Sequence, residues 1–392
     1  MFTRRTFLRQ SLCAACSMAV TGPIAHIAGA YAGEPEVAPF DAPTVISGTA
    51  RERGRQYGAR FADGIRTFLD REIYAVFSGQ PALQDDLLRY AGACAGVIRT
   101  ECPLIADELE GMAEGTGLRL EEHILLTLHE ELYHRGVLPP VPHCTAVAAG
   151  PPETRDGIAY VGQTWDWMPS VAGLSTLLEW RRPEGPSLLA YAFPGLWVGA
   201  GLNANGLALC WTSAALGVAG QMPRIGLPSY VLLAHLLYQE NLDAVRDAAR
   251  RHAHAGWFTF VMADGSGRLM NIEGSPDDVE VEETTGRLVR VGFGTRRMNR
   301  TGADEAVPRH PRCPTMDKLL DAADGQVDLA TLQQSFGEPS CGICVATNTI
   351  DMMVFETTRR TAHLSRGNTY GIARRQYGFT ADRDQPGSAG RR

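Results

Sequence analysis

The sequence lacks several features that would assign it to common classes of protein. After its first 32 residues it has no apolar run of about 18 residues, the length a membrane-spanning helix needs, so we expect no stable membrane association. The formal net charge is −7, which disfavours nucleic acid as a partner because phosphate binding requires a basic surface. The sequence has no phosphate-binding loop, dinucleotide fingerprint or internal repeat. What remains is 392 residues of ordinary globular composition, 44% hydrophobic and 21% charged.

The cysteine pattern is incomplete for a structural zinc site. Cys341 and Cys344 form a C-x-x-C pair, but a four-cysteine site needs a second pair, and the sequence has none. We therefore expect these two cysteines in the core or in a disulfide, and we expect no metal and no cofactor. His252 and His254 stand near the end of an expected helix, where a polar cap is a simpler interpretation than a metal-binding pair.

The N-terminus has the pattern of an export signal. Arg4-Arg5 is followed by Phe7, a weakly apolar segment and small residues up to Ala32. This order predicts a twin-arginine signal peptide at residues 1–32 and therefore a periplasmic or secreted protein. Of the nine cysteines, two lie in this signal. The seven that remain are an odd number, so at least one thiol stays unpaired unless chains pair with each other.

The rest of the chain divides into a helical part and a strand-rich part. Residues 33–47 look like a loose leader, and residues 50–135 show helical spacing, with one helix beginning at Pro103 and another running from Leu120 to His134. After Cys144, short strands are expected near 157–167, 175–181, 187–193, 196–201 and 206–212, with further strands at 257–264, 268–274 and 278–283. Helices are expected at 227–239, at 241–252 and near 314–337, before a closing hairpin at 343–367.

This arrangement predicts an α+β fold in which antiparallel sheets are covered by helices. We divide the chain into the signal peptide at 1–32, a helical segment at 33–143, a strand-rich core at 144–380 and a disordered tail at 381–392.

The most informative stretch is VLPPVPHCTAVAAG, residues 137–150. Three prolines stiffen the chain before His143-Cys144, and only small residues follow the cysteine. An extended leader would hold the carbonyl group of His143 against the thiol, and small residues would leave room for a substrate. Taken alone, these features leave Cys144 open as a packed residue, a disulfide half or a nucleophile, and buried packing is the common role of cysteine.

Local structure should bring a carboxylate near this cysteine. The segments 144–149 and 157–166 are joined by Pro-Pro and Asp-Gly, which favours an antiparallel hairpin centred near residue 154. That register would set Cys144 opposite Gln163 and place Asp166 beside the thiol. Trp165-Asp166-Trp167 is equally consistent with an aromatic core that leaves the carboxylate exposed. If the bond before Cys144 is cut, the new α-amine, with a pKa of about 7.7–8.0, can act as general base for the thiol.

An ordered set of motifs from about Gly48 to Gly367 resembles the acyl-coenzyme A:6-aminopenicillanic acid acyltransferase family. Its members are the isopenicillin-N acyltransferase-like N-terminal-nucleophile hydrolases. The motifs are GTARERGRQYGARF (48–61), PLIADELEGMAEGTGLRLEEHILL (103–126), HCTAVAA (143–149), GQTWDW (162–167) and GLNANGLAL (201–209). The resemblance implies an αββα sandwich of two antiparallel sheets between helices, preceded by a helical segment.

The resemblance also implies a mechanism. The chain would cleave itself between His143 and Cys144 and then transfer an acyl group through a thioester on Cys144, with Asp166 as the catalytic aspartate. Thr145, Gln163 and Asn299 are candidates for substrate or oxyanion contacts. The small and large chains would stay associated, and the substrate would be a small N-acyl amide. Because acyl-coenzyme A is not expected outside the cytoplasm, hydrolysis of a linear amide is favoured over penicillin synthesis.

One departure from the family pattern concerns the oxyanion site. The family carries an asparagine where this sequence has Gly292, and Asn299 lies seven residues later. Loss of one oxyanion donor costs on the order of 10²–10³ in rate. The alternative hypothesis is therefore an uncleaved, catalytically weak member that binds a small molecule or a partner in the periplasm.

Overall fold

The computed structural model describes residues 40–138, 144–213, 223–292, 310–338, 342–345, 348–367 and 375–380, all within one compact unit, Pro39–Arg392. His143, Asn299, the expected signal peptide and the expected tail lie outside these residues. Within the described ranges, no helix has the length and apolar character needed to cross a membrane.

Two β-sheets form the centre of the fold. The larger has eight strands in the order β1 (Thr44–Ile46), β4 (Thr176–Trp180), β5 (Leu188–Phe193), β6 (Leu196–Asn203), β7 (Ala208–Ser213), β8 (Phe258–Ala263), β9 (Leu269–Gly274) and β10 (Val279–Thr284). The smaller has six, in the order β11 (Arg287–Arg290), β2 (Thr145–Ala149), β3 (Tyr160–Asp166), β12 (Thr349–Glu356), β13 (Thr361–Arg366) and β14 (Arg375–Tyr377). Among the described strands, only β1 and β4 pair in parallel.

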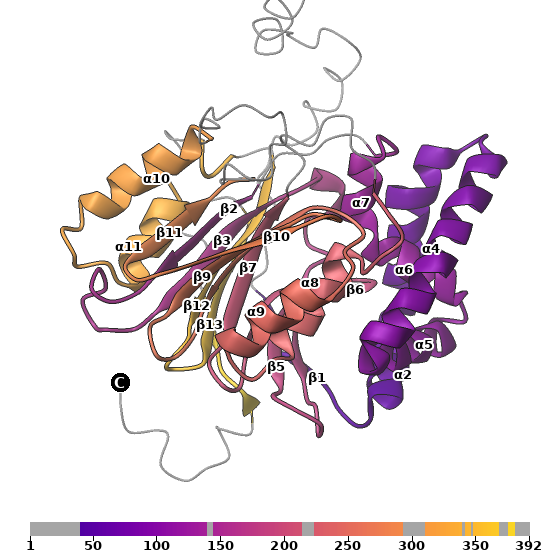
Figure 1. Ribbon diagram of the computed structural model, residues 1–392, viewed down its shortest axis with the longest axis horizontal. Helices are drawn as coiled ribbons and strands as arrows, with labels where there is room; N and C mark the ends of the chain where they lie inside the picture. The colour runs from indigo at the N-terminus through magenta and orange to yellow at the C-terminus, as the bar shows by residue number, and fades with distance from the viewer. Residues whose placement is uncertain are drawn as a thin grey trace, which may run out of the picture. The chain divides into compact units, whose positions relative to one another are not determined.

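Helices cover the outer faces of both sheets (Figure 1). The six-stranded sheet is covered by α10 (Arg312–Asp321) and α11 (Leu329–Phe336), and the eight-stranded sheet by α8 (Ser229–Leu237) and α9 (Leu242–Arg251). Between these helical layers, β2 and β3 pack against β7 and β8. The predicted αββα sandwich is therefore confirmed. The central strands are buried on both faces, which fits their largely apolar sequences.

A helical segment precedes the sandwich, as predicted. It consists of α2 (Ala50–Arg60), α3 (Ala62–Phe68), α4 (Pro81–Glu101), α5 (Pro103–Thr116), α6 (Leu120–Thr127) and α7 (His129–His134), with a π-helical turn at Leu69–Ile73 and a 3-10 turn at Tyr74–Phe77. Prolines occupy the first positions of α4 and α5, where a missing N–H costs nothing. Figure 1 shows this segment, in indigo, beside the layer that contains α8, and α6 contacts α8.

Glycines allow α2 and α5 to pack at unusually close range. A Cβ atom at Gly54 would stand 1.9 Å from the backbone oxygen of Glu108, and one at Gly111 would stand 2.2 Å from that of Arg51. No real Cβ tolerates such distances, so the two helices touch through their backbones. This contact accounts for the glycines in the motifs at 48–61 and 103–126.

A buried ion pair joins this helix pair to the sandwich. The guanidinium of Arg53 donates to Glu108 at 2.7 Å, and both side chains are fully buried. The indole of Trp180 in β4 and the hydroxyl of Tyr238 after α8 donate to the same carboxylate at 3.0 and 2.6 Å. The shared carboxylate therefore fixes the helical segment against both a sheet strand and the covering helices.

The structure corrects several details of the sequence-based assignment. Residues 44–46, which we assigned to a loose leader, form β1, so the segment at 33–143 is not wholly helical and one strand pair is parallel. The helix expected over 120–134 is interrupted at Leu128. The helix α4 lies within the predicted helical segment but was not identified as a separate helix, and the short strands β11 and β14 were not predicted. Edge strands of three or four residues are too short to show a clear alternation of apolar residues.

Candidate active site

The hairpin that carries Cys144 forms as predicted, with a small difference in register. Thr145 pairs with Thr164 and Ala146 with Gln163, so continuing the ladder brings Cys144 level with Trp165 rather than with Gln163. The difference is two residues, which leaves every side chain on the expected face of the sheet. The backbone N–H of Thr145 also donates to the Thr164 hydroxyl at 3.1 Å.

Cys144 lies immediately before β2, and its thiol is free and buried, with 9% of the residue exposed. Strand alternation gives its side chain the same face as Ala146 and Ala148, which pack in the core between the sheets. The thiol donates to the backbone oxygen of Asp166 at 3.9 Å. Burial raises the thiol pKa well above its ordinary value, and the nearby Asp166 carboxylate adds to this. In the uncut chain the thiol is therefore protonated.

The carboxylate of Asp166 is held by two donors on the outer side of the six-stranded sheet. Arg312, the first residue of α10, donates to one oxygen at 2.6 Å, and the Thr349 hydroxyl of β12 donates to the other at 2.6 Å. The side chain is completely buried, so the alternative of an exposed carboxylate is wrong. Burial raises its pKa, while Arg312 and Thr349 act in the opposite direction. Sequence reasoning missed Arg312, which lies 146 residues from its partner.

Thr212 connects Cys144 to the position where the family asparagine is missing. Its hydroxyl donates to the backbone carbonyl of Cys144 at 2.9 Å and accepts from the backbone N–H of Gly292 at 3.2 Å. Gly292 has a φ of +71°, a conformation that favours glycine. The Thr212 hydroxyl therefore links the backbone N–H of Gly292 to the backbone carbonyl of Cys144. Thr212 was not predicted either, because a threonine inside a strand is an ordinary residue.

Two of the predicted contact residues carry polar atoms without a hydrogen-bond partner in the described part of the chain. The side-chain oxygen of Gln163 accepts from the backbone N–H of Trp211 at 2.9 Å, but its amide nitrogen is unpartnered. The hydroxyl of Thr145 and the indole N–H of Trp211 are also unpartnered, and all these atoms are buried. Buried polar atoms are normally satisfied, so these groups are candidates for contact with a bound molecule. Of the other predicted residues, His143 and Asn299 lie outside the described residues.

The remaining predictions concern cysteine and histidine pairs. Cys344 is buried near Asp166, and its C-x-x-C partner Cys341 lies outside the described residues. His254 accounts for the expected cap, because a ring nitrogen lies 2.7 Å from the Ala249 oxygen in the last turn of α9. His252 does not cap the helix with its side chain, because its ring contacts Glu101 and His235.

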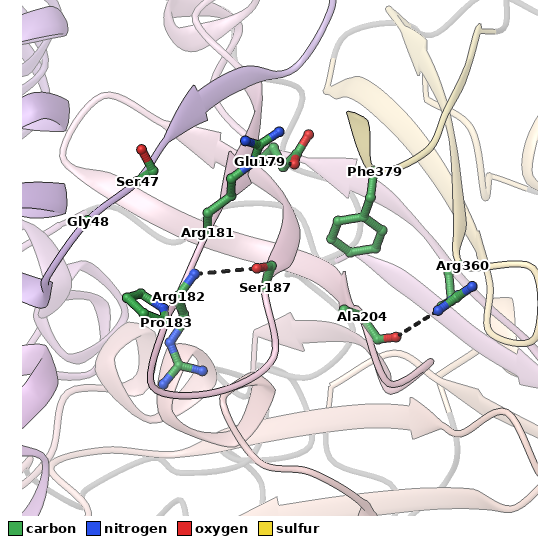
Figure 2. Close-up of a pocket in the computed structure, with 10 residues that line it drawn as sticks. All are labelled: Ser47, Gly48, Glu179, Arg181, Arg182, Pro183, Ser187, Ala204, Arg360 and Phe379. Atoms are coloured by element: carbon green, nitrogen blue, oxygen red, sulfur yellow. Dashed lines mark hydrogen bonds and ion pairs between the residues drawn. The ribbon is translucent and has the colours of Figure 1, made fainter. Parts of the chain in front are cut away.

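A surface pocket of about 450 Å³ is separate from these residues (Figure 2). Its cationic side chains already have partners: Arg181 donates to Glu179, and Arg360 donates to the Ala204 carbonyl. The pocket is lined by Ser47, Gly48, Glu179, Arg181, Arg182, Pro183, Ser187, Ala204, Arg360 and Phe379. None of the residues around Cys144 lines it, so we place the candidate active site at Cys144 and not in this pocket.

Comparisons with known proteins find a matching family model and similar solved structures. The chain is similar to a variant of conjugated bile acid hydrolase from Clostridium perfringens (12% identity, 60% of this chain and 97% of that chain covered, TM-score 0.41). It is also similar to penicillin V acylase from Agrobacterium tumefaciens (14% identity, 60% and 86% covered, TM-score 0.39). No curated protein matches the sequence. Residues 153–369, more than half of the chain, match a family model, and the chain therefore belongs to the acyl-coenzyme A:6-aminopenicillanic acid acyl-transferase family.

Proposed function

We propose that this protein is a self-processing cysteine amidohydrolase or acyltransferase whose nucleophile is Cys144. The observation that carries the proposal is the position of Cys144 just before a central strand. Its thiol contacts the backbone oxygen of Asp166, and the buried carboxylate of the same residue is held by Arg312 and Thr349. Burying a carboxylate together with its cation costs desolvation free energy, which opposes folding. Packing alone therefore does not explain why this pair stands at the end of a strand.

In the proposed maturation step, the Cys144 sulfur attacks the carbonyl carbon of His143. The bond from that carbon to the Cys144 nitrogen breaks as the thioester forms, and the proton that the thiol loses passes to the nitrogen. Water then hydrolyses the thioester, which leaves a carboxylate on His143 and a free thiol and α-amine on Cys144. The thiol pKa is raised before the cut, so the uncut chain is a zymogen whose general base appears only with the new amine.

In the proposed catalytic cycle, the α-amine takes the thiol proton and the sulfur attacks the acyl carbon of the substrate. The leaving amine departs with a proton from the ammonium group, and water or another amine resolves the thioester. Asp166 would orient the α-amine, and Arg312 would keep this aspartate ionised despite its burial. Thr212 would hold the Cys144 backbone in place, with the Gly292 N–H beside it.

The proposed substrate is a small N-acyl amide, encountered in the periplasm or outside the cell after twin-arginine export. Gln163 and Thr145 would contact it with the polar atoms that lack partners, together with Asn299. The helical segment would remain docked after the cut, and the buried contacts of Glu108 with Trp180 and Tyr238 support this.

Intact-mass measurement tests the proposal directly. Wild-type protein should consist of two fragments divided between residues 143 and 144, and Cys144→Ala should remain one chain. Cys210→Ala is the matched control, because this thiol is buried and lies close enough for Cys144 to raise its pKa, but it should not be needed for the cut. A single unbroken chain in wild type would refute self-processing and favour the binding protein described above.

A second measurement addresses catalysis. The cut protein should release free amine from at least one member of a panel of N-acyl amides. Quenched reactions should show the acyl group on the fragment that begins with Cys144. A correctly cut protein that hydrolyses none of the panel and forms no acyl adduct would contradict the proposed activity while leaving maturation intact.

A further inference from the structure

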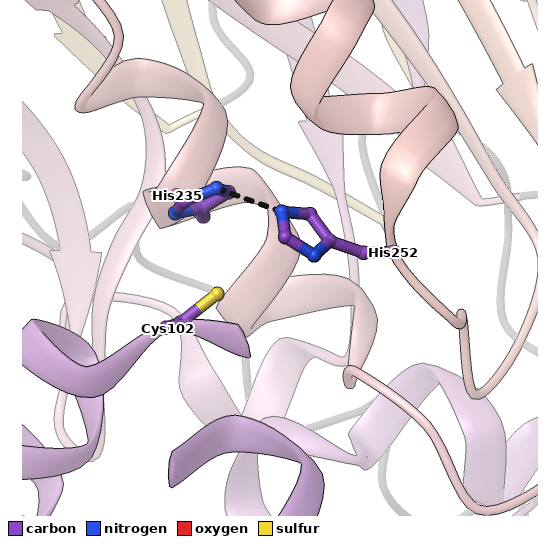
Figure 3. Close-up of side chains that lie close together, drawn as sticks. All are labelled: Cys102, His235 and His252. Carbon is purple, nitrogen blue, oxygen red and sulfur yellow. Dashed lines mark hydrogen bonds between the residues drawn. The ribbon is translucent and has the colours of Figure 1, made fainter. Parts of the chain in front are cut away.

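A cluster of potential metal ligands lies between the helical segment and the helices over the larger sheet. Cys102 stands at the junction of α4 and α5, His235 lies in the last turn of α8, and His252 immediately follows α9 (Figure 3). One donor atom from each residue lies within 4.8 Å of the other two. Within the described ranges, no other three histidine, cysteine or acidic side chains gather in this way.

The ring of His252 is oriented as it is in many metal sites. Its Nδ1 lies 2.7 Å from the Glu101 carboxylate, so this nitrogen carries the proton in the neutral ring. The lone pair is then on Nε2, which faces Nε2 of His235 at 3.2 Å. A carboxylate behind a histidine is the usual partner of a ligating imidazole, because it fixes the tautomer and raises the basicity of the free nitrogen.

The distances suit a tetrahedral ion. Zinc binds imidazole nitrogen at about 2.0–2.1 Å and thiolate sulfur at about 2.3 Å, which separates neighbouring donors by roughly 3.3–3.6 Å. The two histidine nitrogens, at 3.2 Å, are close to that separation, and the sulfur of Cys102 needs to approach by roughly 1.2 Å at most. Figure 3 shows the sulfur directed toward both rings.

Burial and charge also fit. Cys102 is 2% exposed and the side chain of His252 is 4% exposed, so few waters compete for the ligand atoms. Zinc with one thiolate carries a single positive charge, which Glu101 balances. A hydrogen bond between the two histidines explains their contact with each other but not the third donor, the Cys102 thiol, beside them.

We propose that Cys102, His235 and His252 bind a zinc ion, with Glu101 supporting His252 and water in the fourth position. The thiol of Cys102 loses its proton to solvent as the ion binds. Cys102 belongs to the helical segment and both histidines to the following part of the chain, so the ion fastens the two together. If the bond between residues 143 and 144 is cut, the ion joins the two fragments; this last clause alone rests on the proposed function.

Zinc titration of the untagged full-length chain tests the site. The measurement is made on the Cys144→Ala background after dialysis against a chelator, so its result is independent of self-cleavage. One equivalent should bind in competition with a chromophoric chelator and should raise the melting temperature. Cys102→Ser and His252→Gln should lose more than the roughly 10–100-fold in affinity that removal of an outer partner costs, and Glu101→Gln should lose that amount.

Matched controls separate ligand loss from misfolding. His254→Gln and Cys94→Ser alter a histidine and a buried cysteine that are not members of the cluster, and both should bind zinc as the parent does. Cobalt is a second probe: a thiolate-to-cobalt absorption band should form with the parent and be absent from Cys102→Ser. The proposal is overturned if the folded chain binds no stoichiometric zinc, or if binding survives both Cys102→Ser and His252→Gln.

Discussion

Replacing Arg312 with methionine should destabilise the protein in a strongly pH-dependent way. The Arg312 guanidinium is the cation that faces the fully buried carboxylate of Asp166, at 2.6 Å. Removing one partner of such a pair leaves an uncompensated charge and costs about 3–5 kcal/mol. Methionine keeps most of the volume of the arginine stem, so the loss should come mainly from charge and hydrogen bonding.

The pH dependence follows from the direction in which the pKa of Asp166 is shifted. Burial raises the pKa of Asp166, and loss of Arg312 raises it further, so the folded variant binds a proton more readily than the unfolded chain. The unfolding free energy of the variant then falls as pH rises. Below the pKa of Asp166 in the folded variant, each pH unit of acidification restores about 1.4 kcal/mol of unfolding free energy. Most of the loss measured at about pH 8 should therefore disappear by about pH 5.

Chemical denaturation of four proteins measures this effect. Wild type, Arg312→Met, Asp166→Asn and the double variant are compared at both pH values, all on the Cys144→Ala background so that every chain is uncut. Asp166→Asn should remove most of the additional cost of Arg312→Met, because no buried charge remains. An equal loss at both pH values, or no coupling between the two substitutions, would show that Arg312 acts by packing and would refute the electrostatic reasoning.

Three further predictions test other parts of the structure. Gly54→Ala should cost more than about 2 kcal/mol in unfolding free energy, since its Cβ would stand 1.9 Å from a backbone oxygen of α5, whereas Gly96→Ala in α4 meets nothing within 4 Å and should stabilise by up to about 1 kcal/mol. Burial raises the pKa of Glu131 to about 7, so stability should fall as pH rises from about 5 to 7; Glu131→Gln should flatten that fall in melting temperature, and an unchanged slope would contradict the assignment. Thr212→Val should slow cleavage at Cys144 at least about tenfold in a time course by mass, because the cysteine carbonyl loses its donor, while Thr212→Ser should cleave nearly normally.

The elements that the sequence predicted best are those whose signal is local. Short segments rich in strand-forming residues and bounded by turn residues located the strands from β4 to β9, and helical spacing located α8 and α9. The turn residues between 150 and 157 predicted the β2–β3 hairpin and with it the proximity of Cys144 to Asp166. β1 was not predicted because three residues are too few to show a repeating pattern of apolar residues, and its partner strand β4 lies some 130 positions later in the chain.

The chemical state of the candidate site depends on residues that no local pattern reveals. Cys144 and Asp166 come together through one hairpin, but their protonation is decided by burial, by Arg312 from α10 and by Thr349 from β12. Likewise, the position of His252 and His254 near a helix end predicted a polar cap, whereas the ring of His252 meets Glu101 and His235 from other helices. A sequence can therefore identify which side chains are able to react, whereas the tertiary contacts determine which of them are ionised and available. Substitutions at Arg312 and Glu101, which leave the reactive groups themselves intact, are for that reason the sharpest tests of both proposed sites.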